Sequence, residues 1–166
     1  MTLTPLRLAK LISLAVPAAL LAGAYGSQHI AGLAPCEMCF WQRYAHWAAL
    51  AFGIIALAST HRFPDRGRSF VWLAGLCILI SGAIGGYHAG VEAGVFEGFT
   101  QCTSVAGGGA TGDDLLAEIM RAPIVRCDEV QWALLGISMA GWNAILSTLA
   151  ALVILWLSLK PSRIRS

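Results

Sequence analysis

Two cysteines three positions apart are the first residues of this chain that could carry out chemistry. Cys36 and Cys39 form a Cys-x-x-Cys pair in the stretch PCEMCFWQR, and Arg43 follows four positions after the second cysteine. Such a pair can hold a metal ion, form a structural disulfide or act as a redox-active dithiol. Two further cysteines, Cys102 and Cys127, lie much later in the chain. The elements that position these four thiols therefore decide between the three kinds of chemistry.

The composition places this chemistry in a membrane protein. Of the 166 residues, 57% are hydrophobic and 12% are charged, whereas soluble globular domains carry about 25% charged residues. Apolar runs of roughly 20 residues, the length of a membrane-spanning helix, account for the difference. No block of basic residues stands clear of a predicted membrane end, so the sequence gives no indication of nucleic-acid binding.

Four apolar segments are long enough to cross a lipid bilayer as helices. They cover, approximately, residues 11–30, 39–60, 70–87 and 141–159. The last belongs to a charge-free stretch whose beginning, WALLGISMAGW, is expected to lie along the membrane interface or to re-enter it. The sequence thus predicts an all-α fold, an integral membrane four-helix bundle that occupies residues 1–166 as a single membrane domain.

The charges orient this bundle in the membrane. Eight of the eleven Lys and Arg residues lie at the two termini and in the 61–69 loop, which a four-span chain places on one side. The positive-inside rule makes that side cytoplasmic. Eight of the nine acidic residues, all but Asp65, lie on the other side. Both termini are therefore expected to be cytoplasmic, with outer loops at about 31–38 and 88–131.

The start of the chain also permits a competing interpretation. The stretch LRLAKLISLAVPAALLAGAYG has the basic start, apolar middle and small-residue end of a secretory signal. Cleavage near Ala24 would leave three spans and would put the Cys-x-x-Cys pair near a new N-terminus. Four spans explain the charge distribution without cleavage.

The topology sorts the five cysteines. Cys36, Cys39, Cys102 and Cys127 fall in the outer loops, where an oxidising compartment lets disulfides persist. The even number fits two bridges, and the short spacing favours Cys36–Cys39 with Cys102–Cys127, although spacing does not fix connectivity. The segment between the second pair contains the Gly-rich VAGGGATGDD and a predicted short amphipathic helix, DDLLAEIMRAP, which indicates a flexible loop able to present a disulfide. Cys77, in the middle of a span, is expected to pack as a small hydrophobic residue.

The first pair then favours redox chemistry. A zinc site would need Cys102 and Cys127 as further ligands, and a structural staple would close a ring too small to stabilise much. At the start of a helix, by contrast, the helix dipole and free N–H groups lower the thiol pKa, and Arg43 adds positive charge. An arginine in a span either extends to the interface or faces a partner inside the bundle. A quinone, which is lipid-soluble and gains negative charge on reduction, would suit that position.

The combined pattern resembles one known family. Four spans with both termini inside, P-C-x-x-C followed by an arginine in PCEMCFWQR, a second outer cysteine pair and the segment CDEVQWALLGISMAGWN at 127–143 resemble the DsbB family of bacterial inner-membrane disulfide-generating proteins. The resemblance implies a multi-pass protein of the bacterial cell inner membrane with two periplasmic loops. It also implies a left-handed four-helix bundle that holds a quinone at its outer edge.

The resemblance implies an enzymatic activity as well, that of a quinone-dependent protein-dithiol oxidoreductase. Ubiquinone, or menaquinone, would oxidise the Cys36–Cys39 dithiol, and that pair would re-form the Cys102–Cys127 disulfide. The loop disulfide would in turn oxidise a DsbA-like periplasmic thioredoxin-fold carrier and so drive disulfide formation in other proteins. Cys102 would form the mixed disulfide with the carrier, and Cys39 would be the sulfur that meets the quinone.

The same resemblance assigns quinone-binding residues, namely Arg43, Met139 and His88. Gln42 stands where related chains sometimes carry an acidic residue before the arginine. No bound metal is expected.

Three other functions fit parts of the pattern. An enzyme of the vitamin K epoxide reductase type also links quinones to thiols, but its loop pair precedes the Cys-x-x-Cys pair, which is the reverse of the order here. A membrane protein that binds a metal through four cysteines is a second alternative. A non-catalytic membrane protein with structural bridges is a third.

Overall fold

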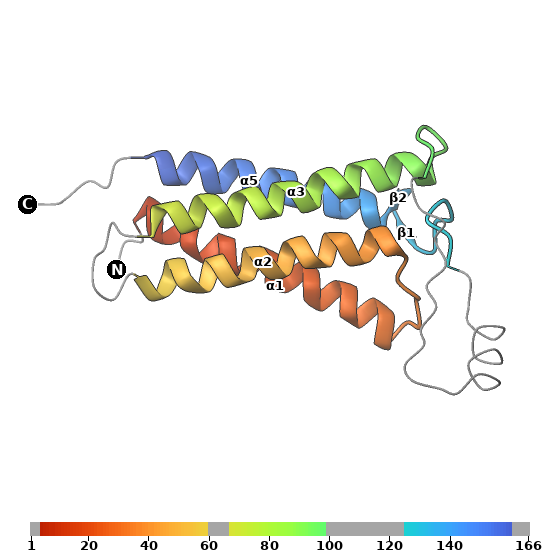
Figure 1. Cartoon of the computed structure of the whole chain (residues 1–166), viewed down its shortest axis with the longest axis horizontal. Helices are drawn as coiled ribbons and strands as arrows, with labels where there is room; N and C mark the ends of the chain where they lie inside the picture. The colour runs from red at the N-terminus through yellow and green to blue at the C-terminus, as the bar shows by residue number, and fades with distance from the viewer. Residues whose placement is uncertain (1–3, 60–66, 99–124, 161–166) are drawn as a thin grey trace, which may run out of the picture.

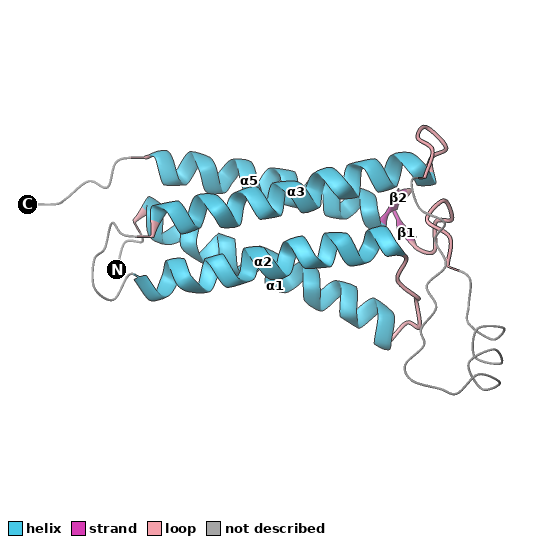
Figure 2. Ribbon diagram, in the orientation of Figure 1, coloured by secondary structure: helices cyan, strands magenta, loops and turns pink. Residues whose placement is uncertain are grey.

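The computed structural model of the chain describes residues 4–59, 67–98 and 125–160. Within these ranges it has four long helices and one short hairpin, drawn in Figure 1 and Figure 2. The elements are α1 (Pro5–His29), α2 (Glu37–Ala58), α3 (Arg68–Glu92), β1 (Ala133–Leu134), β2 (Ile137–Ser138) and α5 (Met139–Leu159). The predicted all-α membrane bundle is confirmed. Cys102, the Gly-rich stretch and the predicted amphipathic helix after it lie outside the described residues.

The four helices pack as a closed ring around a common core. α1 contacts α2 and α5, and α3 contacts the same two helices from the other side. Figure 1 shows that α1 begins and α5 ends at one end of the bundle, while the hairpin lies at the opposite end. Consecutive helices therefore run antiparallel. The end that carries the hairpin is the predicted outer end, and it gathers the residues of the candidate site.

Three of the helices, α1, α3 and α5, are long and apolar enough by themselves to cross a membrane. α2 is the second predicted span, and it lies beside them in the ring. It differs because it buries three polar side chains, Gln42, Arg43 and His46, which lower its mean hydropathy. Buried polar residues in a membrane bundle commonly mark a functional site.

The helix boundaries depart from the predicted ones at the outer end. α3 continues to Glu92 rather than ending at Tyr87, so that His88 is a helical residue rather than part of a loop. α5 starts at Met139, two positions before the predicted Gly141. Both extensions bring side chains of the candidate site onto rigid helices.

The segment before α5 folds as a β-hairpin, a structure that the sequence analysis did not predict. Ala133 pairs with Ser138 and Leu134 with Ile137 in antiparallel register. The two turn residues, Leu135 and Gly136, have φ of 55° and 78°, the left-handed values that a two-residue type I′ turn requires. Ser138 ends the hairpin and caps α5, because its hydroxyl accepts the Gly141 N–H at 3.1 Å. The hairpin thus fixes where α5 begins.

Two glycines let helix backbones approach closely. A Cβ at Gly53 would lie 2.9 Å from the Ser13 carbonyl oxygen of α1, and a Cβ at Gly85 would lie 2.9 Å from the Ala140 carbonyl oxygen of α5. Small residues at such contacts are the usual means of helix association in membranes. The Gly85 contact holds the start of α5 against α3 beside the candidate site.

Candidate functional site

The Cys36–Cys39 pair lies at the start of α2. Cys36 is the N-cap residue, with extended backbone angles of −79° and 174°, and its sulfur accepts the Cys39 N–H at 3.3 Å. The two sulfurs are 3.0 Å apart, and both residues are free cysteines, so the pair stands as a dithiol. The predicted Cys36–Cys39 bridge, the oxidised form of this pair, stays a prediction.

The proton of this dithiol belongs to Cys36. The Cys36 thiol donates to the Cys39 sulfur, and this hydrogen bond together with burial raises the pKa of Cys36 above its ordinary value. The sequence predicted a lowered thiol pKa for a Cys-x-x-Cys pair at a helix start. At Cys36 the pKa is raised instead, because donation to the neighbouring sulfur outweighs the effect of the helix end; the negative charge of the pair is stabilised on Cys39, which accepts the hydrogen bond.

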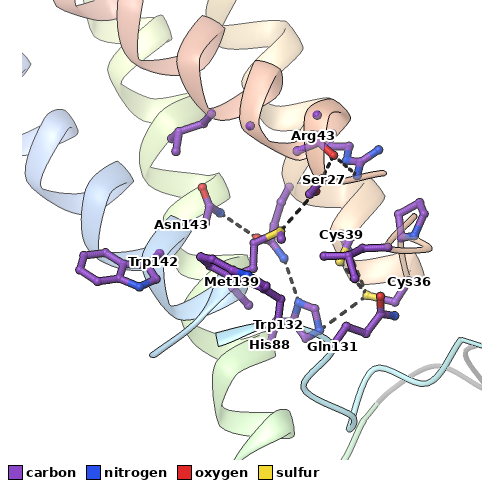
Figure 3. A pocket seen from close by; sticks show the side chains of 18 of the residues that line it. Ser27, Cys36, Cys39, Arg43, His88, Gln131, Trp132, Met139, Trp142 and Asn143 are labelled. Atoms are coloured by element: carbon purple, nitrogen blue, oxygen red, sulfur yellow. Dashed lines mark hydrogen bonds between the residues drawn. The ribbon is translucent and has the colours of Figure 1, made fainter. Parts of the chain in front are cut away.

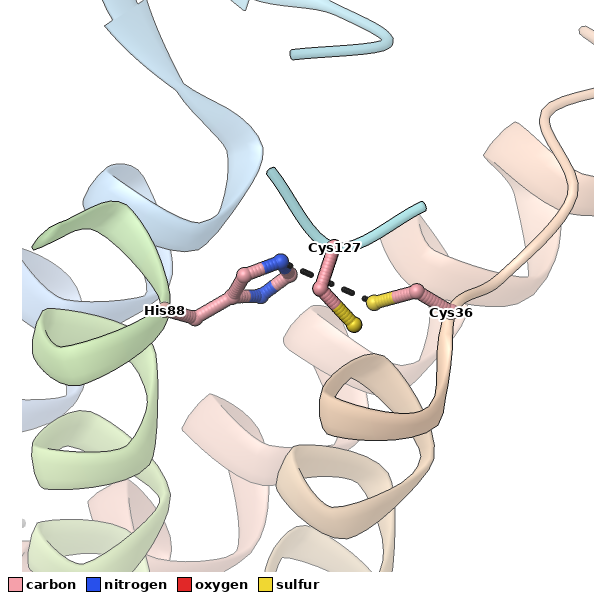
Figure 4. A group of neighbouring side chains, drawn as sticks. All are labelled: Cys36, His88 and Cys127. Carbon is pink, nitrogen blue, oxygen red and sulfur yellow. Dashed lines mark hydrogen bonds between the residues drawn. The ribbon is translucent and has the colours of Figure 1, made fainter. Parts of the chain in front are cut away.

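A cysteine of the second outer loop meets this pair. Figure 4 shows Cys127 next to Cys36, with the ring of His88 beside both. The two sulfurs and a His88 ring nitrogen all lie within 4.8 Å of one another, and all three residues are buried. Cys127 is disulfide-bonded, while Cys102, its predicted partner, lies outside the described residues. The structure therefore brings together members of the two cysteine pairs.

The same three residues are the described His, Cys and acidic groups whose ligand atoms converge enough to hold a metal ion. A sulfur in a disulfide is not a thiolate, and the thiolate is the form that binds zinc. As long as Cys127 is disulfide-bonded, this group offers a metal Cys36 and His88 but no second thiolate.

A cavity of about 580 Å³ opens beside the dithiol at the outer end of the bundle. Figure 3 shows side chains from all four helices and from the segment before α5 around it. Its lining is largely apolar, and it includes Cys36, Cys39 and all three residues predicted to bind a quinone, Arg43, His88 and Met139. These three come from α2, α3 and α5, so the fold collects them from distant parts of the sequence.

Arg43 is buried rather than extended to the interface, since its side chain is only 6% exposed. Its guanidinium donates to the Gln28 side chain at 2.5 Å and to the Ala24 backbone oxygen at 3.0 Å. The same group lies over the rings of Tyr25 at 4.9 Å and Phe40 at 5.5 Å. Arg43 is thus held in a fixed position at the cavity, with further N–H donors to offer to a ligand.

The cavity is also lined by residues that the sequence analysis did not single out, among them Ser27, His46 and Asn143. The Ser27 hydroxyl lies 3.8 Å from the sulfur of Met139, one of the predicted quinone-binding residues, at the start of α5. Asn143 donates to Gln42 at 2.8 Å and accepts from His46 at 2.9 Å. Each of these contacts joins residues far apart in the chain, so no local sequence pattern predicts them.

The comparison with family models decides the relationship. Residues 6–157 match the model for disulfide bond formation protein DsbB. The chain belongs to the DsbB family. DsbB relatives cover almost its whole length: the disulfide bond formation protein B of Polaromonas sp. strain JS666 is 33% identical over 97% of this chain and 95% of its own. The Verminephrobacter eiseniae protein of that name is 32% identical over 92% of this chain and 85% of its own. The comparison with solved structures gives no significant match.

Membership of the DsbB family gives the site its general meaning. The chain is a multi-pass protein of the inner membrane and a disulfide oxidoreductase that acts in disulfide bond formation. The dithiol of the buried Cys36 and the half-buried Cys39 at the outer end of the bundle, with Cys127 next to it, is the arrangement of thiols that such an activity needs.

Proposed function

We propose that this protein re-oxidises a DsbA-like periplasmic thioredoxin-fold carrier and passes the electrons to a membrane quinone, ubiquinone or menaquinone. The observation that carries the proposal is the shared cavity: Cys39 and Arg43, one helical turn apart on α2, both line it. A thiol that delivers electrons and a cation that can bind an electron-rich oxygen thus face the same space.

The cavity fits a quinone head group. Its volume of about 580 Å³ lies within the range of about 300–1,000 Å³ that small-molecule sites occupy. Its largely apolar walls suit a ring with an isoprenoid tail, and Arg43 supplies N–H donors for a ring oxygen. Met139 and His88 would contact the head group from α5 and α3. A bound quinone would supply the two-electron acceptor.

The residues of the chain prepare the dithiol for that transfer. Cys36 keeps its proton and donates to the Cys39 sulfur, which concentrates negative charge on Cys39. The positive charge of Arg43 on the same helix stabilises that negative charge. The apolar walls exclude water, which strengthens both interactions.

Exchange between the two cysteine pairs follows from the position of Cys127. After the carrier has been oxidised, the loop pair Cys102–Cys127 is a dithiol. The Cys127 thiolate attacks the Cys36 sulfur of the Cys36–Cys39 disulfide; a Cys36–Cys127 bond forms and Cys39 leaves with the electron pair. The Cys102 thiolate then attacks the Cys127 sulfur. The Cys102–Cys127 bond forms, the Cys36–Cys127 bond breaks, and Cys36 leaves as a thiolate. Two electrons have moved from the loop pair to the pair at the cavity.

The test is quinone reduction by a reduced DsbA-type carrier with the purified chain. We expect the quinone absorbance to fall by one quinone per carrier dithiol, and we expect no reduction by the Cys36→Ser variant. A carrier that is oxidised without quinone reduction, or a Cys36→Ser variant as active as the unchanged protein, would refute the proposal.

A further inference from the structure

A series of polar side chains, buried at His88 and Gln42 and half-buried at Asn143, connects α3 to α5 beside the cavity. The Gln42 side chain of α2 hydrogen-bonds the Nδ1 of His88 at 3.1 Å and the side chain of Asn143 at 2.8 Å. Gln42 and His88 are 7% and 3% exposed. Buried polar groups in an apolar bundle have few alternative partners, so the direction of each hydrogen bond is set by its neighbours.

Two backbone oxygens fix the orientation of the amides. Gln42 bonds the Met38 carbonyl oxygen at 3.2 Å, and Asn143 bonds the Ser81 carbonyl oxygen at 3.1 Å. A carbonyl oxygen only accepts hydrogen bonds, so the NH₂ group of each amide must face it. The Asn143 NH₂ then also donates to the Gln42 side-chain oxygen, which leaves the Gln42 NH₂ facing His88.

This orientation determines the tautomer of His88. The Gln42 NH₂ can only donate, so the Nδ1 of His88 must accept, and the neutral ring carries its proton on Nε2. That nitrogen lies 3.6 Å from the Cys36 sulfur. The other groups around the ring are the Cys127 backbone and the Glu92 carboxylate, whose oxygen is 3.8 Å from Nε2. His88 therefore presents an N–H donor, and not a base, to the acceptors around it, which are the Cys36 sulfur, the Cys127 backbone and the Glu92 carboxylate.

We propose that Gln42 and Asn143 are positioning residues that hold His88 in the Nε2–H tautomer, and that His88 donates a hydrogen bond to the Cys36 sulfur whenever that sulfur carries negative charge. The inference rests on the proposed function only in taking Cys36 as a redox cysteine. It gives His88 a role in thiol exchange in addition to its predicted contact with a quinone.

The step that this hydrogen bond would accelerate is the departure of the Cys36 thiolate from the Cys36–Cys127 disulfide. When the Cys102 thiolate attacks Cys127, a Cys102–Cys127 bond forms, the Cys36–Cys127 bond breaks, and the electron pair of the broken bond stays on Cys36. A thiol leaves faster as its thiolate becomes more stable. The N–H of His88 stabilises that thiolate, since a hydrogen bond to a charged acceptor is stronger than one to a neutral acceptor.

The tautomer can be measured directly. The chain has four histidines, so the ¹⁵N spectrum of histidine-labelled protein in detergent is simple, and comparison with the His88→Phe variant assigns the His88 signals. We expect the proton on Nε2 in the unchanged protein and on Nδ1 in Gln42→Glu, because a carboxylate facing Nδ1 accepts. The matched control is Ser147→Ala, which removes the 3.0 Å hydrogen bond from Ser147 to the Asn143 oxygen but leaves both amide donors in place. It should keep the Nε2–H tautomer.

The effect on Cys36 is read from the pH dependence of its alkylation in a Cys39→Ser background, followed by peptide mass spectrometry. We expect Gln42→Met to raise the midpoint by about one pH unit, a tenfold loss of thiolate at a fixed pH below the midpoint. His88→Phe should raise it at least as far. In the double variant Gln42→Met should add nothing, because it acts through the ring.

A proton on Nδ1 in the unchanged protein, or a Gln42→Met effect that persists in the His88→Phe background, would overturn the inference. Neither measurement uses a quinone or a carrier. If quinone reduction fails while the tautomer and the alkylation profile are as expected, the proposed function falls and the positioning role of Gln42 and Asn143 stands.

Discussion

The guanidinium of Arg43 donates a hydrogen bond to the side-chain oxygen of Gln28 at 2.5 Å, and this contact ties α2 to α1 at the cavity. Arg43 also bonds the Ala24 backbone oxygen. The charge is therefore held in place by protein groups before any ligand arrives. A preorganised donor of this kind gives a ligand more binding energy than one that must first be ordered.

Replacing Arg43 should weaken quinone use more than thiol exchange. Loss of a charge-assisted hydrogen bond costs about 1.5–3 kcal/mol, so Arg43→Ala should raise the apparent KM for quinone about 10- to 150-fold. Exchange between the loop pair and the carrier should change little, because this exchange does not take place in the cavity. Steady-state kinetics with varied quinone, beside a quinone-free assay of carrier oxidation, separates the two. An unchanged KM would contradict the assigned role.

Gln28→Ala provides a graded version of the same test. It removes the partner that orients Arg43 but keeps the charge, so the rise in KM should be smaller than in Arg43→Ala. An effect as large as that of Arg43→Ala would mean that the position of the guanidinium, rather than its presence, determines binding.

The four cysteines of the two outer loops should each be required. Cys36→Ser, Cys39→Ser, Cys102→Ser and Cys127→Ser should abolish turnover of the carrier, because every one supplies a sulfur that forms or leaves a bond. Cys77→Ser is the matched control, since Cys77 is a free thiol packed against the hydrophobic core. It should keep nearly full activity. The redox state of the carrier, followed by thiol alkylation and gel mobility, checks all five variants.

Adjacent glycines of α3 should differ in their tolerance of a methyl group. In Gly85→Ala the new Cβ would lie 2.9 Å from a backbone oxygen of α5, and overpacking of this kind costs about 1–3 kcal/mol. In Gly86→Ala the nearest atom would be 3.9 Å away, so that variant should be as stable as the unchanged protein. Unfolding by heat in detergent measures both. Equal melting temperatures would show that the α3–α5 contact is looser than described.

Removal of metal should have no effect on turnover. Zinc binding would need thiolates, whereas Cys127 is disulfide-bonded. Carrier oxidation should therefore be the same before and after treatment with a strong chelator, and metal analysis should find no stoichiometric zinc. One zinc per chain together with four reduced thiols would favour the metal-binding alternative instead.

The chemistry of this site could be predicted because it is carried by short and local patterns. The Cys-x-x-Cys spacing and the arginine one turn later lie within a single segment, and the distribution of charges is a simple count along the chain. The structure adds that Arg43, His88 and Met139 line one cavity, a convergence for which the sequence offered only the family resemblance. Their roles toward a quinone stay predictions.

Other features could not be predicted because their partners are distant or their residues atypical. Gln42 and Asn143 are 101 positions apart, so no local pattern indicates that their side chains meet. The hairpin before α5 places Leu135 at positive φ, where Asn, Asp or Gly would have announced a turn. Tertiary packing, and not local propensity, determines both.

The cap of α2 is itself the reactive atom. The sulfur of Cys36 accepts the Cys39 N–H, one of the free N–H groups in the first turn of the helix, and capping interactions contribute about 0.5–2 kcal/mol to helix stability. A sulfur that becomes part of a disulfide accepts hydrogen bonds less well than a thiolate. The local folding free energy of the first helical turn is therefore coupled to the redox state of the pair, and the rate at which the Cys39 amide exchanges its hydrogen with solvent should report which state the enzyme is in.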